Sequence, residues 1–423
     1  LIGNDGGLYV SNDDGNSSLK NNSLPITQFY RFYVDAQNSD KIYGGTQDNS
    51  TIRTQTGGIS DWQVIYGGDG FQPIVDPTNT NVIYALSQRG NLGKSSNNGT
   101  SFSGALSGIP SSDTNNWDTA LTLDPNDSQT LYYGTQKVYK TTNAAGNWTS
   151  ISPDLSNGPY AGNLDFGTVT SIDVSPINSN VIVAGTDDGN VWETSDGGAN
   201  WTKISEALPN RWVTKVLASR EDVNSLYVTF SGYRYGEDDG HVYKSTDSGE
   251  NWLDISEGLP DIPINDIVQD QYGNLFLGTD IGVLSSLDDG ANWEPFGENM
   301  PSVVINDLFI HEASEYMYAA TYGRSSYKMD IGENVLGINN NPLVSGFRMY
   351  PNPASNLVTI LLDNPSENSS ITIYDQLGRI VLNKDIENES DEVPLSLDEL
   401  NKGVYYVYLI SNSMKFTKKL IIK

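Results

Sequence analysis

The stretch Ser245-Thr246-Asp247-Ser248-Gly249-Glu250-Asn251-Trp252 decides the fold of this chain, because its pattern returns along most of the sequence. Each copy has serine or threonine first, Asp or Asn third, Gly fifth and an aromatic residue eighth. Asp or Asn hydrogen-bonds backbone amides ahead of it, Gly adopts the positive φ that closes the bend, and the aromatic ring packs into the core. The pattern therefore predicts a turn between two strands. Its copies are Ser245, Asp247, Gly249 and Trp252; Thr194, Asp196, Gly198 and Trp201; Ser286, Asp288, Gly290 and Trp293; and, more weakly, Ser95, Asn97, Gly99 and Phe102.

The turns belong to a longer unit of four short strands. In its clearest copy these strands are residues 119–125, 130–135, 137–142 and 148–152, rich in β-branched and aromatic residues and bounded by turn formers. A period of about 40 to 50 residues with four strands is typical of β-propeller blades. A landmark of the second strand recurs at Tyr43, Tyr84, Tyr133, Val183, Tyr227, Phe276 and Tyr318.

We therefore predict an all-β fold: a seven- or eight-bladed β-propeller over residues 1–330, followed by a small immunoglobulin-like β-sandwich. The first blade is expected to be incomplete, because residues 1–26 hold only the end of a repeat. The asparagine-rich residues 331–346 are predicted to be a linker. Residues 347–423 show short alternating strands typical of a sandwich. Those strands are expected at residues 357–362, 371–374, 379–383, 403–410 and 415–422.

The composition narrows the classes of partner and chemistry. Lys and Arg number 24 against 53 Asp and Glu, and the resulting net charge of -29 disfavours nucleic acid and anionic membrane surfaces as partners. No apolar run approaches the roughly 20 residues that a membrane-spanning helix needs. The absence of cysteine excludes disulfides and thiolate metal sites. His241 and His311 are the only histidines, which argues against a histidine-rich metal centre or an ordinary Ser-His-Asp hydrolase.

The chain begins inside a repeat, with no initiator Met and no basic-then-apolar leader. We therefore expect it to be the C-terminal part of a longer precursor.

The eight-residue motif resembles the Asp-box (BNR) repeat of sialidases, xyloglucanase-like glycoside hydrolases, sortilin-type receptors and a photosystem II assembly factor. This resemblance covers about the first three quarters of the chain and implies a β-propeller. Those families share the repeat but not one chemistry, so it implies no single function.

The last part of the chain resembles the type A C-terminal sorting domain of the bacterial type IX secretion system. The resemblance implies export, handling of the chain by the secretion machinery and its sortase, removal of the tail, and release or anchoring at the cell surface. The alternative is an accessory domain that binds glycan. The residues that carry the resemblance include Tyr350, Pro351, Asn352, Pro353, Gly378, Gly403, Lys418 and Lys419.

Loops expected on the channel face of the propeller hold the candidate site residues. Carboxylates beside exposed aromatic rings suit a carbohydrate site, because rings stack on sugars while two carboxylates catalyse glycoside hydrolysis. The alternative is that these Asp residues close hairpin turns. The catalytic candidates are Asp48, Asp69, Asp118 and Asp280; the candidates for ligand binding are Gln47, Trp117, Tyr160, Tyr233, Tyr322 and Arg324.

Three functions remain open from the sequence. The favoured one is a secreted or cell-surface propeller that binds an extracellular glycan or protein. The second is a xyloglucanase-like glycoside hydrolase completed by a second propeller upstream; residues 117–125 and 278–282 resemble segments of such enzymes, but their acid would fall at Ala120, with Asp118 displaced from it. The third is a structural or adhesion module. A sialidase is rejected, because none of the arginines has the Arg-Ile-Pro setting expected of that family.

No cofactor is expected. Two oxygen-rich turns, residues 12–15 and 235–240, suggest calcium, but neither has the full spacing of a calcium loop. We interpret both as solvated turns.

Overall fold

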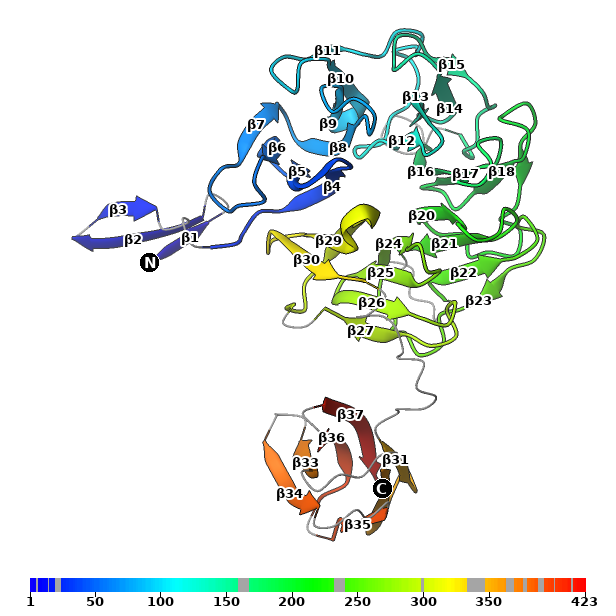
Figure 1. Cartoon of the computed structure of the whole chain (residues 1–423). Helices are drawn as coiled ribbons and strands as arrows, with labels where there is room; N and C mark the ends of the chain where they lie inside the picture. Colours follow the sequence, from blue (N-terminus) through cyan, green and yellow to red (C-terminus); the bar gives the residue numbers. More distant parts are fainter. Residues whose placement is uncertain are drawn as a thin grey trace. The chain divides into compact units, whose positions relative to one another are not determined.

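The computed structural model divides into two compact units, Leu1–Leu336 and Gly337–Lys423, each described by itself below (Figure 1). Its regular structure is almost entirely β-strand, which confirms the predicted all-β class. Two short 3-10 helices, η2 (Gln88–Gly90) and η3 (Glu312–Ser314), lie in the first unit. The described residues are 1–4, 7–13, 15–19, 24–158, 167–231, 240–297, 300–332, 347–362, 369–375, 379–386, 392–398, 400–411 and 414–423. The predicted linker falls almost wholly outside them.

In the described part of the first unit, seven successive antiparallel sheets follow one another from Phe29 onward, six of four strands and the last of three. Within each sheet the strands pair in chain order, so every sheet is a meander of consecutive hairpins. The first strand of each sheet packs against the first strand of the next, and β28 packs against β4. The seven sheets therefore close into a ring, as the propeller prediction requires (Figure 1).

The first, innermost strands are β4 (Phe29–Asp35), β8 (Gly70–Val75), β12 (Leu121–Asp124), β16 (Val169–Val174), β20 (Val213–Ala218), β24 (Ile264–Gln269) and β28 (Ile305–His311). The second strands are β5 (Asn38–Thr46), β9 (Ile83–Ser87), β13 (Asp127–Gly134), β17 (Ile182–Thr186), β21 (Leu226–Phe230), β25 (Leu275–Thr279) and β29 (Tyr316–Thr321). All seven predicted landmarks lie on these second strands. They are buried because both faces of a blade pack against neighbouring blades.

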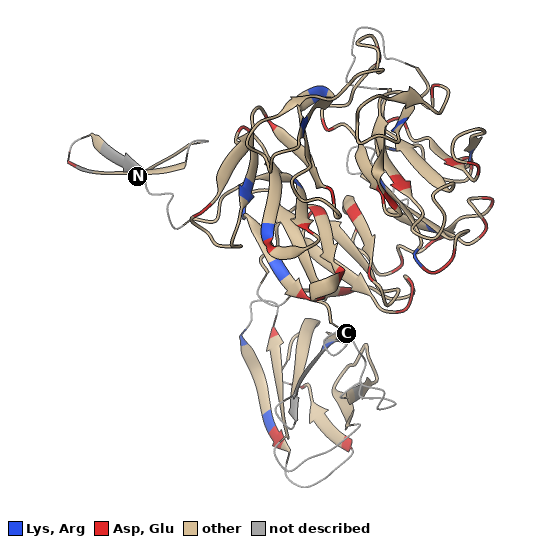
Figure 2. Ribbon diagram, turned by 45° about the horizontal axis from the view of Figure 1, so that its top comes forward, with Lys and Arg blue, Asp and Glu red and all other residues tan. Residues whose placement is uncertain are grey.

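The third strands are β6 (Ser50–Thr54), β10 (Asn91–Ser95), β14 (Val138–Thr141), β18 (Val191–Thr194), β22 (Val242–Ser245), β26 (Gly282–Ser286) and β30 (Ser326–Asp330). The outer strands are short: β7 (Gln63–Tyr66), β11 (Ser103–Gly104), β15 (Thr149–Ser150), β19 (Thr202–Lys203), β23 (Leu253–Asp254) and β27 (Glu294–Phe296). The eight-residue motif joins the third strand to the fourth, as predicted. The acidic side chains of this unit lie mostly in such turns and loops (Figure 2).

The motif of residues 245–252 shows how the turn is built. The Ser245 hydroxyl donates to the Asp247 carboxylate at 2.8 Å and accepts the amide N–H of Gly249 at 2.9 Å. The Asp247 carboxylate also accepts the backbone and side-chain N–H groups of Asn251. The Trp252 ring N–H donates to the Ile204 carbonyl of the preceding sheet at 2.8 Å. This motif therefore closes its own turn and ties one blade to the blade before it, and Trp201 and Trp293 make the same bond in their copies.

Residues 141–148 form a further copy of this turn that the pattern did not identify. Thr141 donates to the Asn143 side chain, and the Trp148 ring N–H donates to the Ala105 carbonyl at 2.7 Å. The fifth place holds Ala145 instead of glycine, at a positive φ of 60°. The rule that glycine fills the fifth place therefore hid this copy, although alanine adopts the same backbone shape at a cost.

Residues 1–19 form a separate sheet of three strands, β1 (Ile2–Asn4), β2 (Gly7–Asp13) and β3 (Asn16–Leu19). The amide N–H of Gly15 donates to the Ser11 hydroxyl at 3.0 Å, the same bond that Gly249 makes to Ser245. This turn thus keeps a bond of the motif, although Ser18 and not an aromatic residue stands at the eighth place.

The second unit is a β-sandwich with its own core. One sheet has the order β31-β32-β35 and the other the order β34-β33-β36-β37. Buried residues from both sheets, such as Val358, Ile371 and Val407, meet between them. The seven strands are β31 (Phe347–Tyr350), β32 (Leu357–Leu362), β33 (Ser369–Asp375), β34 (Ile380–Ile386), β35 (Glu392–Ser396), β36 (Gly403–Ser411) and β37 (Met414–Ile422). The five predicted strands all exist, while β31 and β35 were not predicted as strands.

Candidate functional site

A β-bulge near the start of an innermost strand aims one side chain into the channel mouth. In β24 the pairing with β25 shifts between Ile264 and Asp266, so Asn265 is left out of the ladder. A bulge re-aims the extra residue and bends the strand. Six of the seven innermost strands are irregular at this place; in β12 the irregularity lies at the other end. The side chains presented in this way are Tyr30, Phe71, Thr170, Thr214, Asn265 and Asn306.

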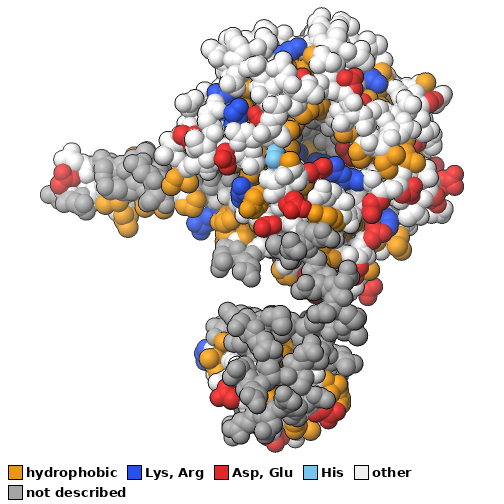
Figure 3. Space-filling view, in the orientation of Figure 1, with side chains coloured by type: hydrophobic (Ala, Val, Ile, Leu, Met, Phe, Trp, Pro, Cys, Tyr) orange, Lys and Arg blue, Asp and Glu red, His pale blue; other side chains and the backbone are white. Residues whose placement is uncertain are grey.

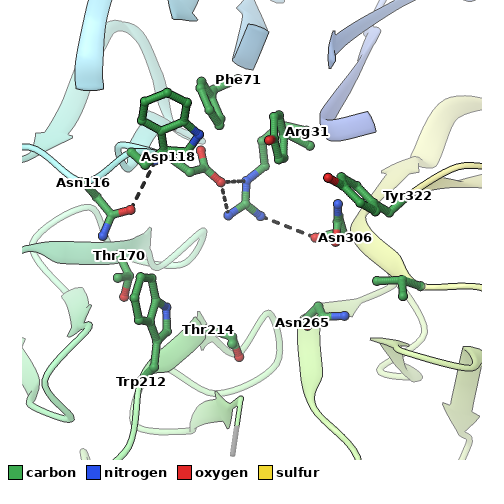
Figure 4. Close-up of a pocket in the computed structure, with 13 residues that line it drawn as sticks. Arg31, Phe71, Asn116, Asp118, Thr170, Trp212, Thr214, Asn265, Asn306 and Tyr322 are labelled. Atoms are coloured by element: carbon green, nitrogen blue, oxygen red, sulfur yellow. Dashed lines mark hydrogen bonds and ion pairs between the residues drawn. The ribbon is translucent and has the colours of Figure 1, made fainter. Parts of the chain in front are cut away.

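These six side chains line one cavity of about 380 Å³ at the channel mouth (Figure 4). The Asn116 side chain, just before β12, accepts the amide N–H of Asp118 at 3.2 Å and so fixes the loop that carries Trp117 and Asp118 into the same cavity. Trp212, Val304, Tyr322 and Arg31 complete the lining. The space-filling view shows the first unit hollowed near its centre, with charged side chains beside the hollow (Figure 3).

One wall of the cavity is polar and belongs to the four sheets from β16 to β28. Each bulged side chain of this wall donates to the carbonyl of the first residue of the next innermost strand, and the last of these bonds joins β28 to β4. The bonds therefore hold the ring together and also fix the polar groups around the cavity. They are Thr170 to Val213 at 2.6 Å, Thr214 to Ile264 at 2.5 Å, Asn265 to Ile305 at 3.0 Å and Asn306 to Phe29 at 2.8 Å.

The opposite wall is aromatic. Tyr30 stacks on Phe71 with ring centroids 4.7 Å apart, and Phe71 meets Trp117 edge to face at 6.1 Å. Tyr322 lies 6.0 Å from Tyr30. Burial raises the pKa of Tyr30 to about 12, so its hydroxyl stays neutral. Trp117 is 38% exposed, which leaves its ring open to a ligand.

Arg31 crosses the channel beneath these walls. Arg31 lies on β4, and its Nε donates to the Asp118 carboxylate at 2.8 Å (Figure 4). Asp118 precedes β12, so the blade that begins with β8 lies between the two residues in the ring. The other end of the Arg31 side chain lies 3.6 Å from the Asp307 carboxylate and 3.5 Å from the Asn306 carbonyl, both on β28. Arg31 therefore connects three blades, and we call it the crossbar. Nearby carboxylates raise its pKa above the ordinary value despite burial, so it remains a cation.

A second, polar cavity of about 610 Å³ lies along the channel beyond the crossbar. It contains Lys215, which pairs with Asp266 at 3.0 Å, and the buried carboxyls of Asp173 and Asp307. Burial raises the pKa of Asp173 to about 6. Burial and the neighbouring Asp266 carboxylate raise the pKa of Asp307 well above its ordinary value.

The structure brings three of the sequence-predicted residues, Trp117, Asp118 and Tyr322, into the cavity. Two more act from behind it: Gln47 accepts a hydrogen bond from the Tyr322 hydroxyl, and Asp280 accepts one from Asn265 at 3.0 Å.

The other described candidates, Asp48, Asp69 and Arg324, do not line this cavity. The Asp69 carboxylate accepts the amide N–H of Asp48 at 2.5 Å, a bond between the residue before β8 and the turn that joins β5 to β6. Arg324 is exposed. Tyr160 and Tyr233 lie outside the described residues.

Sequence reasoning missed Tyr30, Arg31, Phe71, Trp212, Asn265 and Asn306 as site residues. One signal was present: the tripeptide Ile-Asn-Asp occurs at residues 264–266 and again at 305–307, both at the start of an innermost strand. In both copies a polar pair follows an apolar residue directly. The first residue of that pair is the bulged one, and its side chain lines the channel.

Among the described residues, no group of three or more His, Cys, Asp or Glu side chains is arranged to hold a metal ion. The turn at residues 12–15 is described in part: Asp13 accepts a hydrogen bond from Asn16 at 3.2 Å. All but Gly240 of the second oxygen-rich turn lies outside the described residues. In the same described set, no helix combines the length and the apolarity needed to cross a membrane.

Comparisons with known proteins bear on each unit separately. Residues 348–423 match the family described as "Secretion system C-terminal sorting domain". The chain is also 32% identical over 104 residues to an endo-acting ulvan lyase of Formosa agariphila. That match covers 24% of this chain and 20% of the lyase, so the chain spans only about a fifth of that relative.

Solved β-propeller structures share the fold at low sequence identity. An ancestral GH74 enzyme has a TM-score of 0.58 and 14% identity, covering 94% of this chain but only 62% of that enzyme. The GH74 enzyme of Niastella koreensis has a TM-score of 0.51 and 16% identity, covering 93% of this chain and 67% of that enzyme. YCF48, solved with a D1 peptide, has a TM-score of 0.52 and 14% identity, covering 73% of this chain and 95% of YCF48.

At these identities the structural matches show the fold alone. The sorting-domain match shows more, because it identifies the tail that directs export by the type IX system to the cell surface or the medium. The chain therefore joins a β-propeller to a secretion system C-terminal sorting domain, which marks it as a protein exported to the cell surface or the medium.

Proposed function

We propose that the first unit is a binding module for a neutral glycan, held in the cavity at the channel mouth. The observation that supports this most directly is the division of the cavity into an aromatic wall and a wall of hydroxyl and amide groups. A sugar ring has an apolar face that stacks on aromatic rings and a rim of hydroxyls that needs hydrogen-bond partners. The two walls offer both in one cavity.

The charges favour a neutral ligand over an anionic one. Arg31 is the only cation that lines the cavity among the described residues, and Asp118 neutralises it at 2.7 Å. The net charge of -29 sets up a repulsive field for anions. An acidic glycan would have to displace Asp118 from the crossbar and overcome that field.

Binding fits the cavity better than hydrolysis. A glycosidase needs two carboxyl groups that flank the scissile bond. Asp118 is the only carboxylate lining this cavity in the described part of the chain, and its oxygen is held by Arg31. Asp307 lies on the other side of the crossbar, in the second cavity. A sugar at the channel mouth would therefore face one occupied carboxylate.

A glycoside hydrolase remains the second candidate. The observation in its favour is the similarity in fold to GH74 enzymes. This chain covers only 62% of the ancestral GH74 enzyme. In that case a second carboxylate would have to come from another part of the protein. Such an enzyme would release reducing ends from a polysaccharide.

The proposal is tested by titrating the protein with neutral oligosaccharides of glucose, xylose and mannose while recording tryptophan fluorescence and the heat of binding. We expect saturable binding without any release of reducing ends. Trp117→Ala should weaken binding at least tenfold, because the loss of one stacked ring removes a main part of the contact area. The matched control is Tyr272→Ala: Tyr272 is 39% exposed and lies outside the cavity, so this variant should bind like the wild type.

Two results would contradict the proposal. If the Trp117→Ala variant and the wild type bound with equal affinity, the ligand would bind outside this cavity. Binding of unstructured peptides, with no response to any sugar, would make the ligand a protein segment instead.

A further inference from the structure

Resting on the proposed glycan binding, we infer that the cavity takes only the end of a glycan chain, one or two sugar units deep, and that Arg31 stops the chain from passing along the channel. A propeller channel is open at both ends unless side chains fill it. The question is therefore what closes this channel, and where.

The crossbar lies at the boundary between the two cavities. Arg31, Asp118, Thr170 and Thr214 line both of them. On β28 the bulged residue faces the mouth and the next residue faces the far side: Asn306 lines only the first cavity and Asp307 only the second. The Arg31–Asp118 pair stands where one set of side chains gives way to the other.

The crossbar is held from opposite sides of the channel. Arg31 extends from β4, and its partners lie before β12 on one side and on β28 on the other. The Asp307 carboxylate is itself fixed, because it accepts the amide N–H of Phe32 at 2.8 Å. Breaking a partly buried pair leaves an uncompensated charge, which is strongly unfavourable. A neutral sugar offers no charge to replace either partner, so it cannot displace the crossbar cheaply.

The space above the crossbar is small. Its volume of about 380 Å³ lies near the lower end of the range for small-molecule sites, which is about 300–1,000 Å³. Trp117 precedes β12 and Trp212 precedes β20, two blades further around the ring, and both line the cavity. The end of a glycan chain can enter between them. The middle of a glycan chain would also need a way out of the cavity, and the Arg31–Asp118 pair blocks the way along the channel.

The experiment measures how affinity depends on chain length. The whole chain is titrated with linear glucose, xylose and mannose oligosaccharides of one to six units, and with cyclic glucans, which have no ends. We expect the Kd of the binding series to fall from one unit to two and then to change by less than about threefold up to six. The cyclic glucans should fail to compete. A Kd that falls tenfold or more between two and six units, or competition by a cyclic glucan, would overturn the inference.

The role of Arg31 is tested by the double substitution Arg31→Met with Asp118→Asn, which removes both charges of the Arg31–Asp118 pair together. In this variant the six-unit ligand should bind at least fivefold more tightly than the two-unit ligand. Arg31→Gln, which shortens the crossbar but keeps a polar end, is the second variant if the first does not fold. An unchanged, flat length dependence in the folded variant would show that Arg31 is not the stop.

The controls separate this inference from the proposed function. Loss of binding in Trp117→Ala together with affinity that grows with chain length would leave glycan binding intact and refute only the chain-end restriction. No response to any oligosaccharide in the wild type would refute both.

Discussion

Tyr30 and Phe71 occupy the bulged positions of β4 and β8, where the matching positions of four other innermost strands hold threonine or asparagine. Thr170 and Thr214 use this position to bond the next blade. Tyr30 makes no such bond in the described contacts and stacks on Phe71 instead. The cavity therefore has an aromatic wall because Tyr30 and Phe71 stand at positions where other innermost strands have a side chain that bonds the next blade.

This comparison predicts the effect of Tyr30→Thr. The substitution gives β4 the residue found at the same place in β16 and β20, so we expect the fold to tolerate it. Ligand affinity should fall by about tenfold or more, because stacking and apolar contact are lost together. Thr214→Ser, which keeps the hydroxyl that bonds Ile264, is the matched control and should change affinity less than twofold. Tryptophan fluorescence titration measures both, and equal affinities would contradict the assigned wall.

At the same scale, the sequence predicted part of the site. Trp117 and Tyr322 were identifiable because they stand in loops at strand ends, where binding residues concentrate. Tyr30 and Arg31 were not, because they lie inside a strand, β4, where alternation suggests core or solvent. A bulge shifts that alternation, and its position depends on pairing with a second strand that no local pattern reveals.

At the scale of the element, the motif turn does more than reverse the chain. Gly249 has a positive φ of 82°, and a β-carbon built there would lie 2.5 Å from the Ile204 side chain of the preceding blade. The glycine thus serves the turn and the blade contact together. By contrast, a β-carbon at Gly104, on the outer strand β11, would meet nothing within 4 Å.

We therefore predict that Gly249→Ala destabilises the first unit by about 1–3 kcal/mol, from backbone strain and overpacking against Ile204. Gly104→Ala should change the free energy of unfolding by less than about 0.5 kcal/mol. Denaturant unfolding followed by tryptophan fluorescence compares them. If the two variants unfold at the same midpoint, the turn does not constrain the blade contact.

The elements were the most predictable part of the molecule. All seven second strands were located from one buried aromatic or aliphatic residue each, because these strands are covered on both faces and are rich in such residues. The copy at residues 141–148 escaped because Ala145 replaces the glycine while the hydrogen bonds of Thr141 and Trp148 keep the turn. Among the copies in this chain, the hydrogen bonds of the turn are therefore kept even where the fifth place is not glycine.

At the scale of the whole molecule, two groups of carboxyls respond to pH in opposite directions. In the channel, burial raises the pKa of Asp173 to about 6 and that of Asp307 well above its ordinary value. As pH falls from about 7 towards 4, the folded chain takes up protons that the unfolded chain does not, so stability rises.

In the motif turns, hydrogen bonds from Asn200 lower the pKa of Asp196 to about 2, and similar bonds from asparagine lower those of Asp247 and Asp288. Below pH 4 the unfolded chain takes up protons first, so this contribution is lost as pH falls towards 2. These carboxylates are exposed, which keeps the effect of each one small.

We therefore predict a maximum of thermal stability between about pH 4 and pH 6, measured by calorimetry from pH 3 to pH 8. The net charge of -29 contributes in the same direction above pH 5, because repulsion between acidic groups weakens as they are protonated. Salt at 0.5 M screens that repulsion but acts little on buried groups. At high salt, the gain in Tm from pH 7 to pH 5 should persist in the wild type and shrink in the Asp173→Asn and Asp307→Asn double variant, while the loss below pH 4 stays the same in both. A Tm that climbs steadily to pH 8, or an equal gain in the double variant, would show that the channel carboxyls do not set the optimum.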